Sequence, residues 1–104
     1  MTVKFQEAVL SRVKQIPKGN VTTYGEIARA ITGTVGAARA VGQAVARNQY
    51  PIIIPCHRVV RSNGDLGGYS LGVAKKIRLL SAEGIEIIGG KILNFERVLF
   101  LFEK

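Results

Sequence analysis

Residues 51–60 of the chain read PIIIPCHRVV, and this stretch decides how the rest of the sequence is interpreted. It places the only cysteine, Cys56, next to the only histidine, His57. Proline restricts its own φ angle and drives the preceding residue towards an extended conformation, so Pro55 should present Cys56 on a stiff segment. We expect the three isoleucines, residues 52–54, to anchor that segment in the core. The stretch thus combines the two groups most useful for nucleophilic chemistry near neutral pH.

The composition indicates a single compact domain spanning residues 1–104, because 47% of the residues are hydrophobic and 21% are charged. No signal-peptide region and no apolar stretch long enough to cross a bilayer occur, so we expect a cytoplasmic protein without a membrane partner. One cysteine cannot form an internal disulfide, and one cysteine with one histidine cannot supply the four ligands of a structural zinc site. We therefore expect no metal, and the thiol is either a buried hydrophobic group or a reactive one.

Basic residues dominate the middle of the chain. Fifteen Lys and Arg against seven Asp and Glu give a net charge of +8, and no acidic residue lies between Ile27 and Gly64. Such a region suits a polyanionic partner, because arginine neutralises phosphates and releases counterions. The alternative is a generically basic surface, and charge alone does not decide between them.

Helical periodicity predicts three helices before the Cys-His stretch, over residues 3–16, 23–31 and 37–46. Thr23 and Glu26 fit a capping box at the start of the second helix, with Thr23 capping a backbone N–H and Glu26 reaching back. Asn48 is placed to end the third helix. The second and third helices, joined by a glycine-containing turn, resemble a helix-turn-helix, and the alternative is an ordinary αα-hairpin.

The second half predicts a loop over residues 61–70, a fourth helix and a β-hairpin over residues 85–93. On the fourth helix the inner face should carry Val73, Ile77 and Leu80, and Gly84 should end it. Lys75, Lys76 and Arg78 should lie on its outer face. The apolar end, residues 98–102, is either a last core element or a self-association surface of an otherwise monomeric protein. The fold class is therefore α+β and mainly α, with a winged-helix-like helix-turn-helix and a small hairpin.

Several motifs together resemble the O6-alkylguanine-DNA alkyltransferases, and in particular their C-terminal catalytic and DNA-binding domain. PCHRV at residues 55–59 is followed by GGYS at residues 67–70 and by Glu83-Gly84. Further matches are Asn48, Pro51, Tyr24 and ARAVG at residues 38–42. The resemblance covers residues 3–93 and predicts the fold of that domain.

The resemblance implies direct DNA repair by irreversible transfer of an alkyl group, chiefly methyl, from O6 of guanine in duplex DNA to Cys56, in a single turnover and without a cofactor. A thiolate is a nucleophile suited to attack on an alkyl carbon, but few free cysteines are ionised at pH 7. The resemblance assigns activation through water to His57, orientation of the histidine to Glu83 and bracing of the backbone to Asn48. Neighbouring side chains of an extended segment point opposite ways, so the relay needs a bridging water or a local turn.

An enzyme that attacks O6 must also rotate the nucleotide out of the duplex. The resemblance gives Arg39 the vacated place in the base stack and Tyr24 the displacement and hydrogen bonding of the base. The alternatives are a plain phosphate contact for Arg39 and a half-buried aromatic for Tyr24. Small residues of the third helix would allow close approach to the minor groove, namely Ala37, Ala38, Ala40 and Gly42. The resemblance also implies a base pocket lined by Tyr69, Ser70 and the backbone at Val59, with Pro51 as its wall.

Two departures from the family bear on this interpretation. Many members carry a separate N-terminal domain that has no counterpart in this sequence. Single-domain relatives include alkyltransferase-like proteins, which bind alkylated DNA without repairing it and typically have tryptophan instead of the cysteine. Cys56 favours an enzyme over such a damage-recognition protein and over a helix-turn-helix regulator. GYSL at residues 68–71 differs from the Tyr-Arg-Trp run of bacterial members and leaves the range of alkyl groups open.

Overall fold

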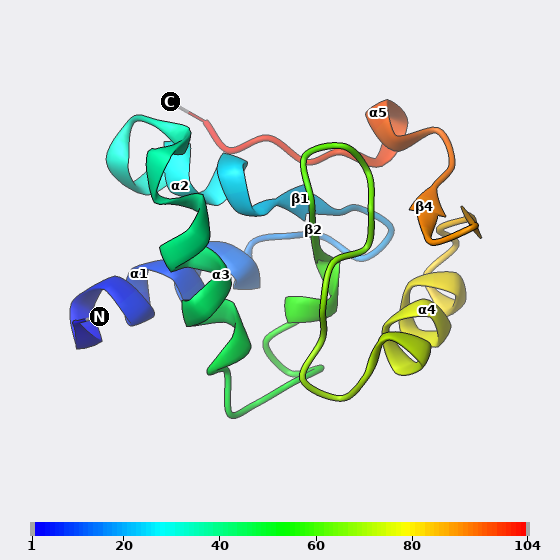
Figure 1. Ribbon diagram of the computed structural model, residues 1–104, viewed down its shortest axis with the longest axis horizontal. Coiled ribbons are helices and arrows are strands. Elements are labelled where there is room, and N and C mark those ends of the chain that lie inside the picture. Colours follow the sequence, from blue (N-terminus) through cyan, green and yellow to red (C-terminus); the bar gives the residue numbers. More distant parts are fainter. Residues whose placement is uncertain (1, 104) are drawn as a thin grey trace.

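The computed structural model describes residues 2–103. Three helices, α1 (Val3–Lys14), α2 (Tyr24–Thr32) and α3 (Ala38–Ala46), pack together on one side of the molecule, and α4 (Val73–Ala82) lies on the other (Figure 1). A 3-10 turn, η1 (Val35–Ala37), joins α2 to α3. The predicted helix-turn-helix and the mainly α fold class are therefore confirmed. No helix within the described residues is long and apolar enough to cross a membrane.

Two small sheets connect these helices. Strand β1 (Thr22–Thr23) pairs in parallel with β2 (Val59–Val60), which directly follows a 3-10 turn, η2 (Cys56–Arg58). Strands β3 (Ile87–Ile88) and β4 (Lys91–Ile92) form the predicted antiparallel hairpin. A short helix, α5 (Phe95–Val98), leads into the C-terminal segment. The pairing of β1 with β2 thus joins the start of the helix-turn-helix to the end of the Cys-His turn.

The core consists of two clusters of buried side chains on either side of β1 and β2. Val59 and Val60 are neighbours in a strand, where successive side chains point to opposite faces, and each enters a different cluster. The first cluster lies among α1, α2 and α3, and the second lies beneath α4 and the hairpin. Burial of both clusters fixes the two halves of the molecule against the same pair of strands.

Of the two predicted hydrogen bonds of the capping box at α2, only the one to the Thr23 hydroxyl is present. The Glu26 backbone N–H donates to the Thr23 hydroxyl at 2.9 Å. The carboxylate of Glu26 does not reach back to Thr23. It accepts instead from the Arg29 side chain and from the Phe102 backbone N–H, because the C-terminal segment lies alongside α2.

The C-terminal segment packs as an element of the core. Within one copy of the chain this agrees with the first of the two predicted alternatives, a last core element. The Phe100 N–H donates to Val21 O at 2.7 Å, and the Thr22 hydroxyl donates to Phe100 O at 2.8 Å. Phe102 is 5% exposed, and the Arg12 guanidinium lies 5.4 Å from its ring centroid. Figure 1 shows the segment running from α5 across the molecule to α2.

The orientation of α4 corrects two predictions. Lys76 was expected on the outer face, but it is 0% exposed, whereas Val73, expected on the inner face, is 45% exposed. The Lys76 ammonium donates to the backbone carbonyls of Val59, Leu66 and Gly68. A hydrophobic pattern cannot indicate this arrangement, because the acceptors are backbone groups of other segments. The predicted end of α4 is confirmed, since Gly84 has a φ of +88°.

The isoleucine run corrects a third prediction. Only Ile54 is buried, whereas Ile52 and Ile53 are exposed, Ile53 by 81%. The run forms a turn in which Ile52 has a φ of +77°. Asn48 closes this turn, because its amide donates to Ile54 O at 3.0 Å and its carbonyl oxygen accepts from the Tyr50 N–H at 2.9 Å.

We predict that Phe102→Ala lowers the free energy of unfolding by about 3–5 kcal/mol, because it removes a buried aromatic side chain and leaves a cavity. Urea unfolding followed by circular dichroism measures the change. Leu101→Ala is the matched control, since Leu101 is 62% exposed and its truncation should cost less than about 0.5 kcal/mol. Equal effects of both substitutions would contradict a core role for Phe102.

We predict that Lys76 gives stability an unusual pH dependence. Burial lowers the pKa of Lys76 from its ordinary value of 10.5 to about 8. Between these two values the unfolded chain binds more protons than the folded chain, so the stability of the protein rises with pH across this interval. Between pH 8 and pH 10.5, the free energy of unfolding of the wild-type chain should rise by on the order of 3 kcal/mol relative to that of Lys76→Met. Parallel stability profiles of the two proteins would contradict this prediction.

Candidate active site

Cys56 lies at the first position of the turn η2, where its thiol is only 3% exposed. The turn is closed by the Arg58 N–H, which donates to Pro55 O at 2.9 Å. The segment is therefore not extended through Cys56 and His57, and a local turn, one of the two arrangements that the prediction allowed, is present. Asn48 holds the backbone immediately before this turn through Ile54 O.

His57 and Glu83 lie in direct contact, as expected of a relay. His57 Nε2 is 3.0 Å from Glu83 Oε2, and the imidazole is almost completely buried. Burial alone would raise the pKa of Glu83, but hydrogen bonds from Arg58 and His57 hold it below its usual range. An ionised carboxylate only accepts hydrogen bonds, so Nε2 is the donor, and in the neutral form of the imidazole Nδ1 has the free lone pair. Among the described residues Nδ1 has no hydrogen-bond partner.

Cys56 borders a cavity of about 340 Å³ that opens between α3 and the loop after β2. Burial raises the pKa of Tyr24 and of Tyr69, so both phenols stay protonated and can donate hydrogen bonds. The Tyr69 hydroxyl is buried and has no partner among the described residues. The lining consists of Tyr24, Gly42, Val45, Ala46, Cys56, Gly68, Tyr69 and Ser70.

Two of the four predicted pocket residues lie at this cavity and two do not. Tyr69 and Ser70 line it. Val59 is completely buried in the core, and Pro51 lies in the turn that Asn48 closes. The prediction treated the stretch from Pro51 to Pro55 as one edge of the pocket, but only Cys56, the residue after this stretch, lines the cavity.

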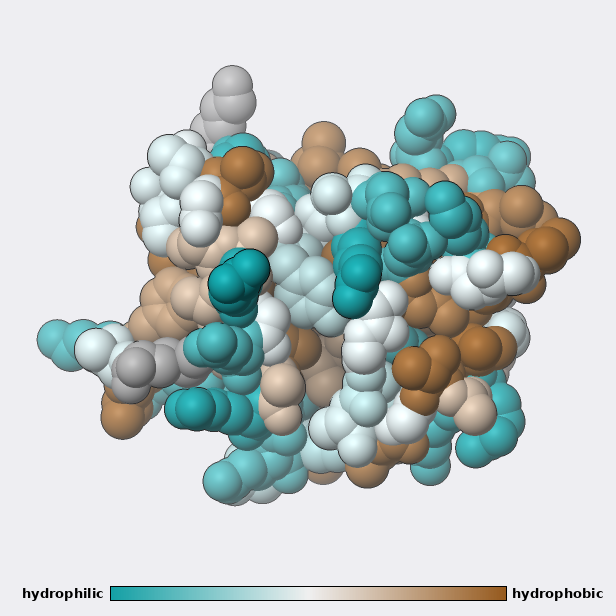
Figure 2. Space-filling model, viewed as in Figure 1, coloured by the Kyte–Doolittle hydropathy of each residue, from teal (hydrophilic) through white to brown (hydrophobic). Residues whose placement is uncertain are grey.

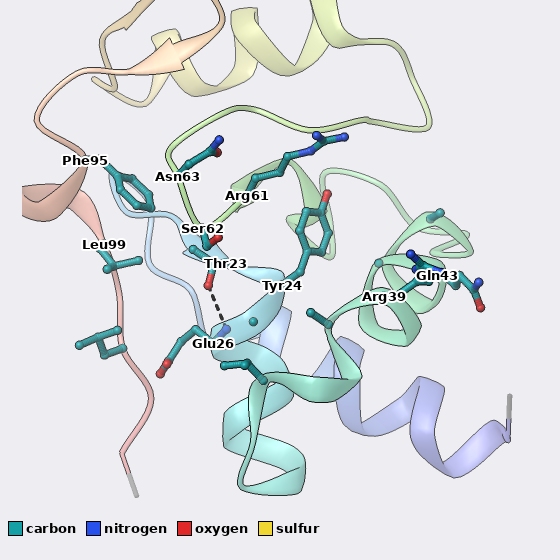
Figure 3. Close-up of a pocket in the computed structure, with 16 residues that line it drawn as sticks. Thr23, Tyr24, Glu26, Arg39, Gln43, Arg61, Ser62, Asn63, Phe95 and Leu99 are labelled. Atoms are coloured by element: carbon teal, nitrogen blue, oxygen red, sulfur yellow. Dashed lines mark hydrogen bonds between the residues drawn. The ribbon is translucent and has the colours of Figure 1, made fainter.

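A larger groove of about 1010 Å³ adjoins this cavity along the helix-turn-helix (Figure 3). Tyr24, Gly42 and Ala46 line both spaces, so these residues lie at the border between groove and cavity. A Cβ atom on Gly42 would lie 3.8 Å from the Tyr24 ring, an ordinary van der Waals contact, so the ring packs beside α3 at this position. Ala38 also lines the groove, whereas Ala37 and Ala40 are half-buried beside it.

Arg39 and Arg61 border the groove from opposite sides, Arg39 on α3 and Arg61 in the loop after β2 (Figure 3). Both side chains are exposed. Figure 2 shows strongly hydrophilic side chains on either side of a hollow near the centre of this face. The groove therefore combines an apolar floor with cationic edges, which suits a polyanion that also carries flat apolar groups.

Sequence reasoning missed the supporting roles of Lys76 and Arg58. Lys76 ties β2 to Leu66 and Gly68 in the loop that carries Tyr69. Arg58 donates to Glu83 through Nε at 2.9 Å and through Nη2 at 2.7 Å. The position of Arg58, two residues after Cys56 and directly beside His57, was a signal in the sequence, but its partner could not be inferred from it.

Comparison with known proteins places the chain in a family. The profile described as "6-O-methylguanine DNA methyltransferase, DNA binding domain" matches residues 4–85. A methylated-DNA–protein-cysteine methyltransferase of Methanothermobacter thermautotrophicus is 46% identical over 86 residues, which are 83% of this chain and 47% of that protein. A bifunctional methyltransferase/endonuclease of Picrophilus torridus is 54% identical over 79% of this chain and 27% of its own length. The chain thus spans half or less of these curated relatives.

Two solved structures have the same fold. OGT of Mycobacterium tuberculosis in complex with DNA matches with a TM-score of 0.75 and 44% identity over 80% of this chain and 51% of that chain. Atl1 of S. pombe, in complex with damaged DNA containing O6-carboxymethylguanine, matches with a TM-score of 0.82 and 33% identity over 96% of this chain and 97% of that chain. The chain belongs to the family of 6-O-methylguanine DNA methyltransferases, because residues 4–85 match the DNA-binding domain of that family and the curated relatives agree.

Proposed function

We propose that the chain repairs DNA by transferring an alkyl group, chiefly methyl, from O6 of guanine irreversibly to Sγ of Cys56. It would act as a single domain over residues 1–104 that corresponds to the C-terminal catalytic domain of longer relatives, inside the cell with the DNA. The observation that carries the proposal is the Cys56 thiol in a cavity next to a buried imidazole, whose Nε2 is 3.0 Å from an ionised carboxylate. A solitary buried cysteine with a structural role would need neither group.

The proposed chemistry uses the free lone pair of His57 Nδ1. This nitrogen takes the proton of the Cys56 thiol through a water molecule, and Glu83 stabilises the imidazolium that forms. The thiolate then attacks the alkyl carbon, so that the S–C bond forms while the C–O6 bond breaks and its electron pair leaves with guanine. The phenols of Tyr24 and Tyr69 donate hydrogen bonds to the leaving base.

Duplex DNA is the proposed partner, because the OGT and Atl1 structures that the chain matches hold DNA. The groove beside α3 would take the minor groove, and a nucleotide would rotate past Tyr24 into the cavity. Arg39 would fill the vacated place in the stack. Close approach of α3 would depend on its small residues, Ala37, Ala38, Ala40 and Gly42.

A second candidate function is recognition of alkylated DNA without repair. The fold match to Atl1, which was solved with O6-carboxymethylguanine DNA, with a TM-score of 0.82, is the observation that brings it into consideration. The thiol placed beside a complete His-Glu relay favours the enzyme, because recognition alone does not require a nucleophile.

We predict that incubation with duplex DNA containing O6-methylguanine adds one methyl group to the protein, and intact-mass spectrometry measures the gain. Peptide mapping should place the group on Cys56. Cys56→Ala should bind the same duplex and keep its mass. Tight binding by the wild-type chain without any change of mass would support the recognition function instead.

We predict that Arg39→Ala slows alkyl transfer from duplex DNA by at least about tenfold but leaves transfer from the free base O6-benzylguanine nearly unchanged. A free base needs no rotation out of a stack, so only the duplex reaction depends on Arg39. Arg78→Ala, which removes an exposed charge from α4 away from the groove, is the matched control. An equal loss on both substrates would exclude a role of Arg39 in base rotation.

A further inference from the structure

Arg58 has contacts that the proposed chemistry does not use. Its Nε and Nη2 donate to the two carboxylate oxygens of Glu83, and its Nη1 donates to Ile16 O at 2.8 Å, just after the end of α1. The Arg58 and Glu83 side chains are 15% and 11% exposed. A planar, two-point ion pair so little exposed to water is among the stronger and more rigid contacts that a protein makes.

One oxygen of Glu83 serves two donors. Oε2 accepts from His57 Nε2 at 3.0 Å and from Arg58 Nη2 at 2.7 Å. A protonated imidazole would therefore lie within about 6 Å of the guanidinium, close enough for like charges to disfavour the imidazolium. The arginine thus offsets part of the attraction that the carboxylate exerts on that imidazolium.

The other charged or titratable groups near the imidazole do not offset the carboxylate in the same way. Tyr69 meets the His57 ring edge to face at 6.3 Å, and its raised pKa keeps it neutral. Lys76 lies on α4, the helix that Glu83 follows, and donates to the backbone carbonyls of Val59, Leu66 and Gly68. Cys56, the neighbour of His57 in η2, is the thiol whose proton the relay must accept. Arg58 is therefore the cation that shares the carboxylate with the histidine.

We propose that Arg58 is a positioning residue that tunes the relay, by fixing Glu83 and by keeping His57 neutral and ready to accept the thiol proton. The proposal deepens the proposed function and rests on it for its biological meaning. The two-point ion pair between Arg58 and Glu83 fixes the carboxylate relative to the end of α1. Nε2 of His57 therefore remains the protonated nitrogen, and Nδ1 remains the acceptor. The charge keeps the imidazole from taking a proton from solvent before it accepts the thiol proton.

The test uses the fact that the chain has one histidine, whose imidazole gives a single set of NMR signals. The titration is performed on Cys56→Ser, so that ionisation of the thiol does not couple to that of the imidazole. Adding Arg58→Met should raise the midpoint of the imidazole titration by about one pH unit, because a like charge is removed while the carboxylate stays. The midpoint for Arg58→Lys should lie between those of the protein that keeps Arg58 and of Arg58→Met, because lysine keeps the positive charge but cannot form the two-point ion pair.

Two controls separate this role from a merely structural one. Arg78→Met removes a cation that has no ion pair among the described residues and should leave the midpoint unchanged. In a Glu83→Gln background, Arg58→Met should still raise the midpoint, because the repulsion between the guanidinium and the imidazolium does not need the carboxylate. An unchanged midpoint in folded Arg58→Met, with Glu83 present, would overturn the proposal.

A neutral isostere covers the case in which Arg58→Met does not fold. Arg58→Gln keeps hydrogen-bond donors for Glu83 but not the charge, and it should also raise the midpoint, whereas an unchanged midpoint would overturn the proposal. The same variants in the Cys56 chain should shift the acidic limb of the pH–rate profile of methyl transfer upwards, with a loss of about tenfold below the midpoint. Because the titration needs no substrate, it distinguishes failure of this inference from failure of the proposed alkyl transfer.

Discussion

The parallel pairing of β1 with β2 is the constraint on which the site depends. Thr22 lies opposite Val59, so the residue that begins α2, Tyr24, and the turn that precedes β2 are brought to the same place. These segments are more than thirty residues apart in the chain, and the strands involved are only two residues long. Burial of Val59 and Val60 in separate clusters keeps such a short pairing in register, because a slip by one residue would exchange their faces. The site is therefore as stable as the packing on both sides of these strands.

Local signals made the helices and the hairpin predictable from the sequence. The Thr23 cap, the periodic apolar residues of α1 and the glycine at position 84 each act through neighbours in the chain, and each prediction was confirmed within a few residues. The placement of Cys56, His57 and Glu83 was inferred from the family resemblance, and the structure places Cys56 at the cavity and His57 in contact with Glu83. Their functional roles remain predictions.

Non-local contacts account for the predictions that were wrong. Lys76 was placed outside because charge usually indicates exposure, but three backbone carbonyls from two other segments replace its water. Ile52 and Ile53 were placed inside because they are hydrophobic, but the Asn48 side chain imposes a turn that directs them outward. Glu26 was expected to cap its own helix, but the C-terminal segment, more than seventy residues away, provides its partner. None of these contacts leaves a periodic trace in the sequence.

The position of Lys76 distinguishes the total charge near the cavity from the stabilisation of the departing oxygen. Its ammonium reaches the carbonyl of Gly68, a residue of the cavity wall, so a fixed positive field extends to the reacting groups. In the proposed transfer the negative charge begins on sulfur and ends on guanine, and the net charge inside the cavity does not change. A positive charge that acts equally on both states does not lower the barrier of the exchange. In the proposed transfer, acceleration would fall to groups that touch the departing oxygen, for which the phenols of Tyr24 and Tyr69 in the cavity wall are the candidates.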